Sequence, residues 1–117
     1  MDLVTFEIAK KLKEKGFREK VNAYYDIKFR IYNIHPALDM NNVEYRASAP
    51  TISQVLKWLR EEKKIHICIS YSDNINTMWE YEVILLDGAL YQNDDSDYIS
   101  YEQAALAGIE YVLDNLI

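Results

Sequence analysis

The sequence is poor in cysteine, proline and glycine, with one, two and three of them among 117 residues. The single Cys68 excludes an internal disulfide, and a lone thiol in an apolar segment favours a reducing compartment. The apolar run Val83–Leu86 is far shorter than the roughly 20 residues that a membrane-spanning helix needs. We therefore expect a cytoplasmic protein without a membrane segment.

The chain also lacks the features that mark targeting segments and linkers. Residues 1–7 contain no basic stretch followed by an apolar one, so no secretion signal is expected. We find no internal repeat, low-complexity tract or interdomain linker rich in proline and glycine. Half of the residues are apolar and 27% are charged, a balance typical of a globular protein. We predict a single domain that covers residues 1–117.

Basic residues are absent from the second part of the sequence. Residues 1–64 hold all 13 lysines and arginines with nine acids, a net charge of +4, whereas residues 65–117 hold ten acids and no base, a net charge of −10. The total charge of −6 makes nucleic acid an unfavoured partner, because polyanions attract clustered cations. The acids Asp94, Asp95 and Asp97 favour a basic protein partner, and a purely solubilising surface is the alternative.

Three segments have the apolar spacing of helices. The first covers about residues 5–15 and ends at Gly16, which tolerates a left-handed cap. The pairs Thr51/Gln54 and Ser100/Gln103 have capping-box spacing and mark the starts of the other two. The expected core positions of these two helices are Ile52, Val55, Leu56, Leu59, Ala105, Ile109, Val112, Leu113 and Leu116.

A meander of three strands is predicted over Ile65–Gln92. Residues 65–71 alternate apolar and polar side chains, and residues 78–86 do the same, so the two segments should pair antiparallel. Asp87 and Gly88 are typical of a two-residue hairpin turn into a short third strand.

The region between the first two helices is less regular. Residues 21–29 are rich in aromatic and β-branched side chains and predict a strand, whereas residues 32–48 show no clean period and are expected to be irregular. The expected fold is therefore α+β, a three- or four-stranded antiparallel sheet with three helices in the order α-β-α-β-β-β-α.

Two pairs of side chains on the predicted strands have chemistry suited to a site. His66 and Cys68 share one strand face and could act as metal ligands or as a base and a nucleophile, but a metal site needs three or four ligands. Glu80 and Glu82 also share a face and could form an acid/base pair, although exposed carboxylates on an outer sheet face are commoner. We predict no catalytic residue, no metal site and no cofactor.

The segment from Asn93 to Asp97 resembles the beginning of a calcium-binding loop. The match fails at two defined positions, because Ser100 stands where glycine is required and Leu106 stands where glutamate is required. A solvated loop in front of the last helix is the favoured interpretation.

Two further features could serve binding. Trp79 and Tyr81 could belong to an aromatic platform, or they could be core residues whose polar tips reach water. The basic residues 10–20 of the first helix could contact phosphate or an acidic protein, with a solvated helix face as the alternative. The helix at Thr51 followed by a hairpin has the outline of a winged helix, but residues 72–76 offer no basic wing.

The final helix contains Gly108 near Tyr111, in a segment that otherwise consists of good helix formers. Glycine inside a helix costs about 1 kcal/mol relative to alanine, so a close approach of backbone is expected there. The approaching element is either the chain's own sheet or the same helix of a second copy, so a homodimer is one of two predictions.

Two segments resemble a family of small proteins from bacterial phages and mobile elements. They are Ala49–Glu61, with its Pro-Thr start and Trp-Leu-Arg-Glu centre, and Tyr101–Glu110. The resemblance implies a bacterial cytosolic setting and carries no functional residues. We expect a non-enzymatic accessory or interaction protein. The alternatives are a nucleic-acid-binding domain that uses the basic N-terminal helix and a small enzyme with an unrecognised site.

Overall fold

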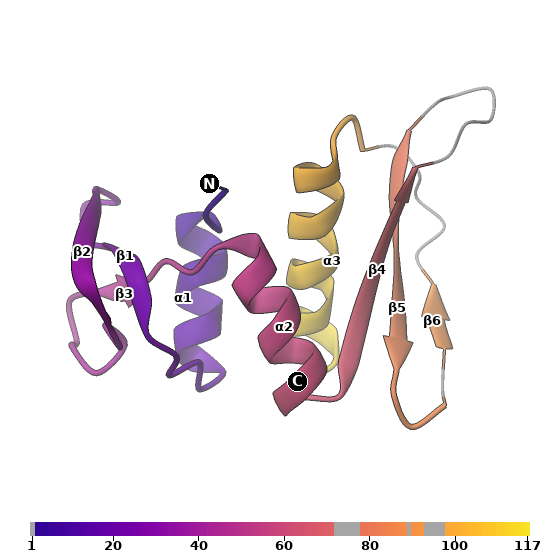
Figure 1. Ribbon diagram of the computed structural model, residues 1–117, viewed down its shortest axis with the longest axis horizontal. Coiled ribbons are helices and arrows are strands. Elements are labelled where there is room, and N and C mark those ends of the chain that lie inside the picture. Colours follow the sequence, from indigo (N-terminus) through magenta and orange to yellow (C-terminus); the bar gives the residue numbers. More distant parts are fainter. Residues whose placement is uncertain (1, 72–77, 89, 93–97) are drawn as a thin grey trace. The chain divides into compact units, whose positions relative to one another are not determined.

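The computed structural model describes residues 2–71, 78–88, 90–92 and 98–117 (Figure 1). These residues form three helices and two three-stranded antiparallel sheets, which confirms the α+β class. The chain divides into two compact units, Met1–Thr51 and Ile52–Ile117, and each unit is described by itself.

Unit 1, residues 1–51, combines one helix with one small sheet. Helix α1 is Phe6–Glu14, and the strands are β1 (Val21–Tyr25), β2 (Ile31–Leu38) and β3 (Ala47–Ser48). Their order in the sheet is β2-β1-β3, so the central strand pairs antiparallel with both neighbours.

Residues at both ends of α1 stabilise its termini, and Gly16 ends the helix as predicted. The hydroxyl of Thr5 accepts a hydrogen bond from the Ile8 N–H, which caps the helix start. Gly16 takes a φ of 88° after the helix, and the Phe17 N–H then donates to the Leu12 carbonyl. Phe17 is fully buried, so the chain folds back across the last turn of α1.

Two predictions for unit 1 are wrong. The strand predicted over residues 21–29 ends at Tyr25, because residues 26–30 form the turn of a hairpin, and the stretch predicted to be irregular contains β2 and β3. The sequence pattern does not predict β2 because both of its faces are mostly exposed, and burial therefore imposes no alternation of apolar and polar residues. The sheet of unit 1 is therefore additional to the predicted meander.

A buried amide holds the irregular connection between β2 and β3. The Asn41 Nδ2 donates to the Phe17 carbonyl at 2.7 Å, and its Oδ1 accepts from the Ser48 N–H at 2.8 Å. The Ser48 Oγ in turn accepts from the Met40 N–H at 3.0 Å. These bonds satisfy backbone groups that no regular element serves.

Unit 2, residues 52–117, is a meander with two helices on one of its faces. Helix α2 (Ile52–Glu62) precedes β4 (Ile65–Tyr71), β5 (Trp79–Leu85) and β6 (Leu90–Gln92), and helix α3 (Tyr101–Asn115) ends the unit. Figure 1 shows α2 and α3 on the same side of the sheet. The side chains of β4 and β5 that face these helices form the inner face of the sheet.

The predicted meander is confirmed, with one difference at its second turn. Strands β4 and β5 pair without a register shift from Ile65↔Leu85 to Tyr71↔Trp79. The expected two-residue turn is wider, because the Gly88 N–H donates to the Leu85 carbonyl and Gly88, but not Asp87, has a positive φ. Glycine is suited to that left-handed position.

The core of unit 2 lies between the inner face and the two helices. Four of the five predicted core positions of the last helix are buried in α3, together with Ala104 and Gly108, whereas Leu116 follows the helix and is half-buried. In α2, Trp58 is buried and Leu56 is half-buried, whereas the sequence pattern placed Leu56 in the core. The buried face of α2 therefore consists of Ile52, Val55, Trp58 and Leu59, with Leu56 at its border. Among the described residues, no helix has the length and apolar character that crossing a membrane requires.

This difference predicts a difference in stability between two leucine variants of α2. Leu59 is fully buried, so Leu59→Ala should lower the free energy of unfolding by about 2–5 kcal/mol. Leu56→Ala removes the same atoms from a half-buried position and should cost less than about half as much. Urea unfolding followed by tryptophan fluorescence measures both values, and equal losses would contradict the burial described for α2.

Candidate functional site

A pocket of about 160 Å³ opens on the surface of unit 1, beside the hairpin of β1 and β2. Helix α1 supplies one wall, the hairpin turn supplies a second, and the connection before β3 supplies a third. We call it the hairpin pocket. Its lining residues are Phe6, Lys10, Lys13, Tyr25, Asp26, Ile27, Glu44, Tyr45, Arg46 and Ala47.

Aromatic contacts fix the apolar wall of the hairpin pocket. The Phe6 ring contacts the Tyr25 and Phe29 rings edge-on, with distances between ring centres of 5.6 Å and 4.5 Å. The Tyr25 hydroxyl donates to the Val4 carbonyl at 2.8 Å, and burial raises the pKa of this hydroxyl. The aromatic side chains are therefore held by neighbours instead of turning freely.

The Lys13 ammonium positions the third wall. Its Nζ donates to the carbonyls of Val43 and Arg46, each at 2.6 Å, and to the Glu44 carbonyl at 3.3 Å. Three carbonyl acceptors match the three donors of an ammonium group. Lys13 therefore ties the connection before β3 to α1, and its charge is used inside unit 1.

The Asp26 carboxylate organises the hairpin turn. It accepts hydrogen bonds from the N–H groups of Lys28 and Arg30, from the Arg30 Nε at 2.9 Å and from the Tyr32 hydroxyl at 3.1 Å. Desolvation of the carboxyl acts to raise its pKa, but these donors outweigh it and lower the pKa from 3.8 to about 2. The turn can then carry Phe29 at a φ of 64°, beside Phe6.

The surface around the hairpin pocket is apolar with cations at its rim. Ile27 and Tyr45 are each 66% exposed, and Phe29 is 65% exposed. The Arg46 guanidinium lies 4.8 Å from the centre of the Tyr24 ring, a cation–π distance, and exposed Lys10 also lines the pocket. Exposed large apolar side chains that cluster beside a pocket are typical of a binding surface.

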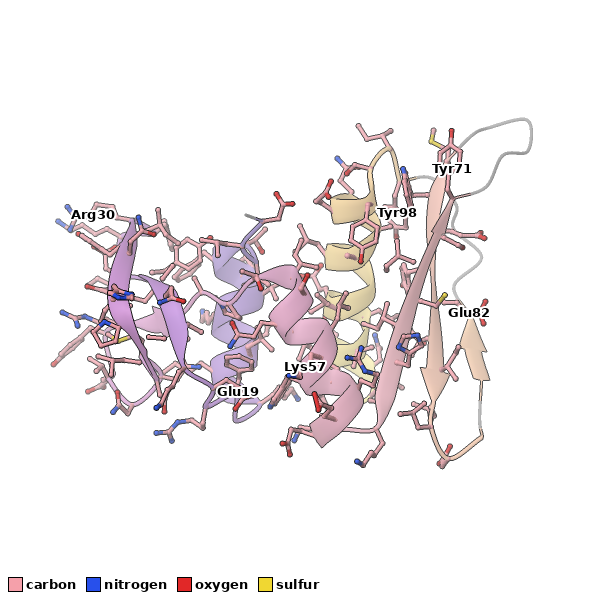
Figure 2. All side chains as sticks on the ribbon, in the orientation of Figure 1. Glu19, Arg30, Lys57, Tyr71, Glu82 and Tyr98 are labelled. Carbon is pink, nitrogen blue, oxygen red and sulfur yellow. The ribbon has the colours of Figure 1, made fainter. Side chains whose placement is uncertain are left out.

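The two candidate pairs of unit 2 come together on the sheet face opposite α3. Cys68 lies directly across from Glu82, and Ser70 lies across from Glu80, to which its hydroxyl donates at 3.3 Å. Figure 2 shows Glu82 on the side of the sheet away from α3. Within the described residues, no group of three or more histidine, cysteine, aspartate or glutamate side chains is placed to hold a metal ion.

The aromatic candidates Trp79 and Tyr81 lie on the inner face. Tyr81 is buried, and its ring is 6.3 Å from that of Tyr111. Trp79 is half-buried, and its ring centre lies 5.1 Å from that of Tyr71 and 5.7 Å from that of Tyr101. Tyr81 is thus a core residue, and Trp79 joins a smaller cluster at the end of the sheet.

Gly108 lies against the chain's own sheet. A Cβ at this position would stand 2.9 Å from the Ile67 Cγ2 and 3.1 Å from two atoms of the Tyr81 ring. Of the two elements that the sequence analysis considered, the close approach is therefore to β4 and β5. The missing side chain lets α3 pack directly on these strands.

Some sequence candidates lie outside the described residues. They include Asp94, Asp95 and Asp97, together with residues 72–76, which occupy the position of the wing in a winged helix. Ser100, the predicted cap of the last helix, is described, and its hydroxyl accepts from the Gln103 N–H at 3.1 Å.

Sequence reasoning missed the hairpin pocket entirely. Its residues come from three segments that are brought together by β2 and by the Lys13 bonds, and neither feature has a local pattern. One available signal was the density of large side chains around Asp26, which suggests a strand but also marks an exposed apolar turn.

The packing of Gly108 predicts that a methyl group added there destabilises unit 2. Gly108→Ala gains about 1 kcal/mol of helix propensity, but the extra atom must displace a branched side chain and a buried ring, at a cost of about 1–3 kcal/mol. Urea unfolding should show a net loss of stability. A gain in stability would mean that the helix is not pressed against the sheet at this point.

The bonds to Asp26 predict an acid-sensitive turn. Because its pKa in the fold lies below the ordinary value, the carboxylate contributes stability above about pH 4, and this contribution is lost as the pH falls toward 2. Asp26→Asn should therefore be less stable than the wild type at neutral pH, and the difference should shrink between pH 4 and pH 2. A carboxyl titration by NMR with a midpoint at the ordinary value would contradict the bonding described.

Comparisons of the chain with protein-family models, with curated proteins and with solved structures found no match. The function is therefore argued from the geometry of the chain itself.

Proposed function

We propose that the protein is a non-enzymatic interaction protein, and that its hairpin pocket binds a large apolar side chain of a partner segment rich in carboxylates. The observation that carries the proposal is the open pocket between Phe6, Tyr25 and Tyr45, with cations at its rim. We further propose that a phage or mobile element encodes the protein and that it acts in the bacterial cytoplasm. The free thiol of exposed Cys68 supports a reducing compartment.

The shape and lining of the hairpin pocket support an anchor of side-chain size. Binding interfaces draw most of their energy from a few large apolar groups that enter preformed pockets. The pocket volume of about 160 Å³ suits one such group and not an extended ligand. Ile27, Phe29 and Tyr45 are exposed around the opening and would lose contact with water when a partner segment covers them.

The charges around the hairpin pocket support an acidic partner. Unit 1 has nine basic and seven acidic residues, a net charge of +2 in a chain of net charge −6. The Asp26 carboxylate, which lies at the pocket, already pairs with Arg30 at 2.9 Å. Exposed Glu44 also lines the pocket, as do the exposed cations Lys10 and Arg46, the latter with its guanidinium over the Tyr24 ring. Carboxylates beside the anchor would meet these cations and would speed the encounter of the two surfaces.

The alternatives receive less support from the geometry. Several cations that nucleic acid would need are engaged within unit 1: Lys13 with three carbonyls, Arg18 with Asp39 at 2.6 Å and Arg30 with Asp26. An enzyme would need a nucleophile or an acid/base pair directed at a substrate, and two of the titratable groups at the pocket, Asp26 and Lys13, are engaged in hydrogen bonds within unit 1. The basic partner expected for Asp94 and its neighbours stays a prediction.

Three short peptides test the proposed function. Acetyl-Glu-Phe-Glu-amide carries both the anchor and the carboxylates, acetyl-Gln-Phe-Gln-amide lacks the charges, and acetyl-Glu-Ala-Glu-amide lacks the anchor. In NMR titrations the first peptide should shift the amide signals of Phe6, Tyr25 and Tyr45. Replacing the anchor should weaken binding about tenfold or more, because a buried phenyl ring contributes about 2 kcal/mol. Removing the charges should weaken binding less and should abolish its dependence on salt.

Matched variants locate the binding. Tyr45→Ala should remove the response, whereas Tyr71→Ala changes an exposed tyrosine of unit 2 and should leave it intact. Lys10→Gln should lower the salt dependence, and Lys28→Gln, outside the pocket lining, should not. Shifts that are absent from the pocket residues would refute the proposal. Salt-dependent binding of duplex DNA through the α1 lysines would favour the nucleic-acid alternative.

A further inference from the structure

We propose that the outer edge of β4, which pairs with no strand in the described part of the chain, pairs antiparallel with β4 of a second copy, so that two three-stranded sheets join around a two-fold axis. This surface belongs to unit 2 and is independent of the hairpin pocket.

The hydrogen bonds of the meander show which groups of β4 remain for a partner. The Leu86 N–H donates to the Lys64 carbonyl, and the register pairs Ile65 with Leu85. In an antiparallel pair, bonded and non-bonded positions alternate, so His66, Cys68 and Ser70 exchange bonds with β5. The N–H and C=O groups of the other β4 residues point to the outer edge; these residues are Ile65, Ile67, Ile69 and Tyr71.

The other sheet edges in the described part of the chain are protected against pairing. Strand β3 has two residues and β6 has three, while β2 contains Pro36 and its pairing with β1 has a register shift. Short strands, proline and irregular pairing are the usual devices that block edge-to-edge association. Strand β4 has seven residues, pairs with β5 without a shift, and contains no proline, lysine, arginine, aspartate or glutamate.

The sequence of β4 is complementary to itself. If Cys68 lies opposite its own copy, Ile67 lies opposite Ile69, Ile65 opposite Tyr71, and His66 opposite Ser70. Apolar side chains then meet apolar ones on the inner face, and polar side chains meet polar ones on the opposite face. This register uses all of the outward backbone groups and forms about eight hydrogen bonds, two for each bonded pair.

Charge also permits a second copy at this edge, although unit 2 is acidic. Glu80 and Glu82 are on β5, one strand away from the joining edge. Across the two-fold axis, Glu82 and its counterpart would be three strand spacings apart, about 14 Å. This separation exceeds the Debye length of about 8 Å at physiological salt, so the repulsion is largely screened.

Sedimentation equilibrium of the full chain, with Cys68 reduced, tests the proposal. The wild type should approach twice the chain mass as its concentration rises, and its melting temperature should rise with concentration. Mild oxidation of the single thiol should then link two chains through Cys68, because residues opposite each other in a non-bonded pair are about 4.5 Å apart at their Cα atoms. A wild-type chain that stays monomeric at millimolar concentration would overturn the proposal.

One substitution separates loss of the dimer from loss of the fold. Cys68→Lys places the new ammonium opposite Glu82 within the chain, a favourable cross-strand pair, but opposite a second ammonium in the dimer. The dissociation constant should rise more than about tenfold, while the melting temperature at low concentration is kept. Cys68→Ser is the matched neutral control and should remain dimeric.

The outcomes also distinguish this surface from the hairpin pocket. A Cys68→Lys variant that dimerises with the dissociation constant of the wild type would show that association uses another surface, and the proposal would be wrong. Tyr45→Ala should leave the dimer mass unchanged, and the peptide titrations of unit 1 should be unaffected by Cys68→Lys. Failure of either proposal therefore leaves the other standing.

Discussion

The constraint on which both units depend is that backbone polar groups must find partners in a chain with few long elements. In unit 1 the strands are short, and side chains supply the missing bonds. Asn41 serves the Phe17 carbonyl and the Ser48 N–H, and Lys13 gathers the carbonyls at 43, 44 and 46. Without these polar anchors the connection before β3 would have no defined path, because it is too irregular to form a ladder of its own.

The same constraint has the opposite outcome in unit 2. Its meander satisfies the backbone of β5 on both sides, through β4 on one side and through β6 and Tyr98 on the other. The N–H and C=O groups on the outer edge of β4 have no partner strand among the described residues. The hairpin pocket and the β4 edge are thus two consequences of one requirement, one met by side chains and one left for a neighbouring molecule.

The fold was predictable wherever burial on one face imposed a period on the sequence. Ile65, Ile67 and Ile69 alternate with more polar residues because α3 covers one face of the sheet, and the capping-box spacing of Ser100 and Gln103 marked the start of α3. Strand β2 was not predictable, since exposure on both faces removes the alternation. The hairpin pocket was missed for a related reason: its shape depends on backbone carbonyls, which leave no trace in side-chain patterns. At Gly108 the sequence predicted a close approach, and only the structure could identify the approaching strands.

The way in which Lys13 is bonded has a consequence for how the hairpin pocket can change over evolution. Its ammonium recognises backbone carbonyls, and every type of residue has one. The side chains of Val43, Glu44 and Tyr45 are therefore free to diverge while the path of the wall is kept. A single lysine on α1 thus separates the architecture of the pocket from its specificity, so descendants of this chain can acquire new partners through a few loop substitutions without first acquiring a new scaffold.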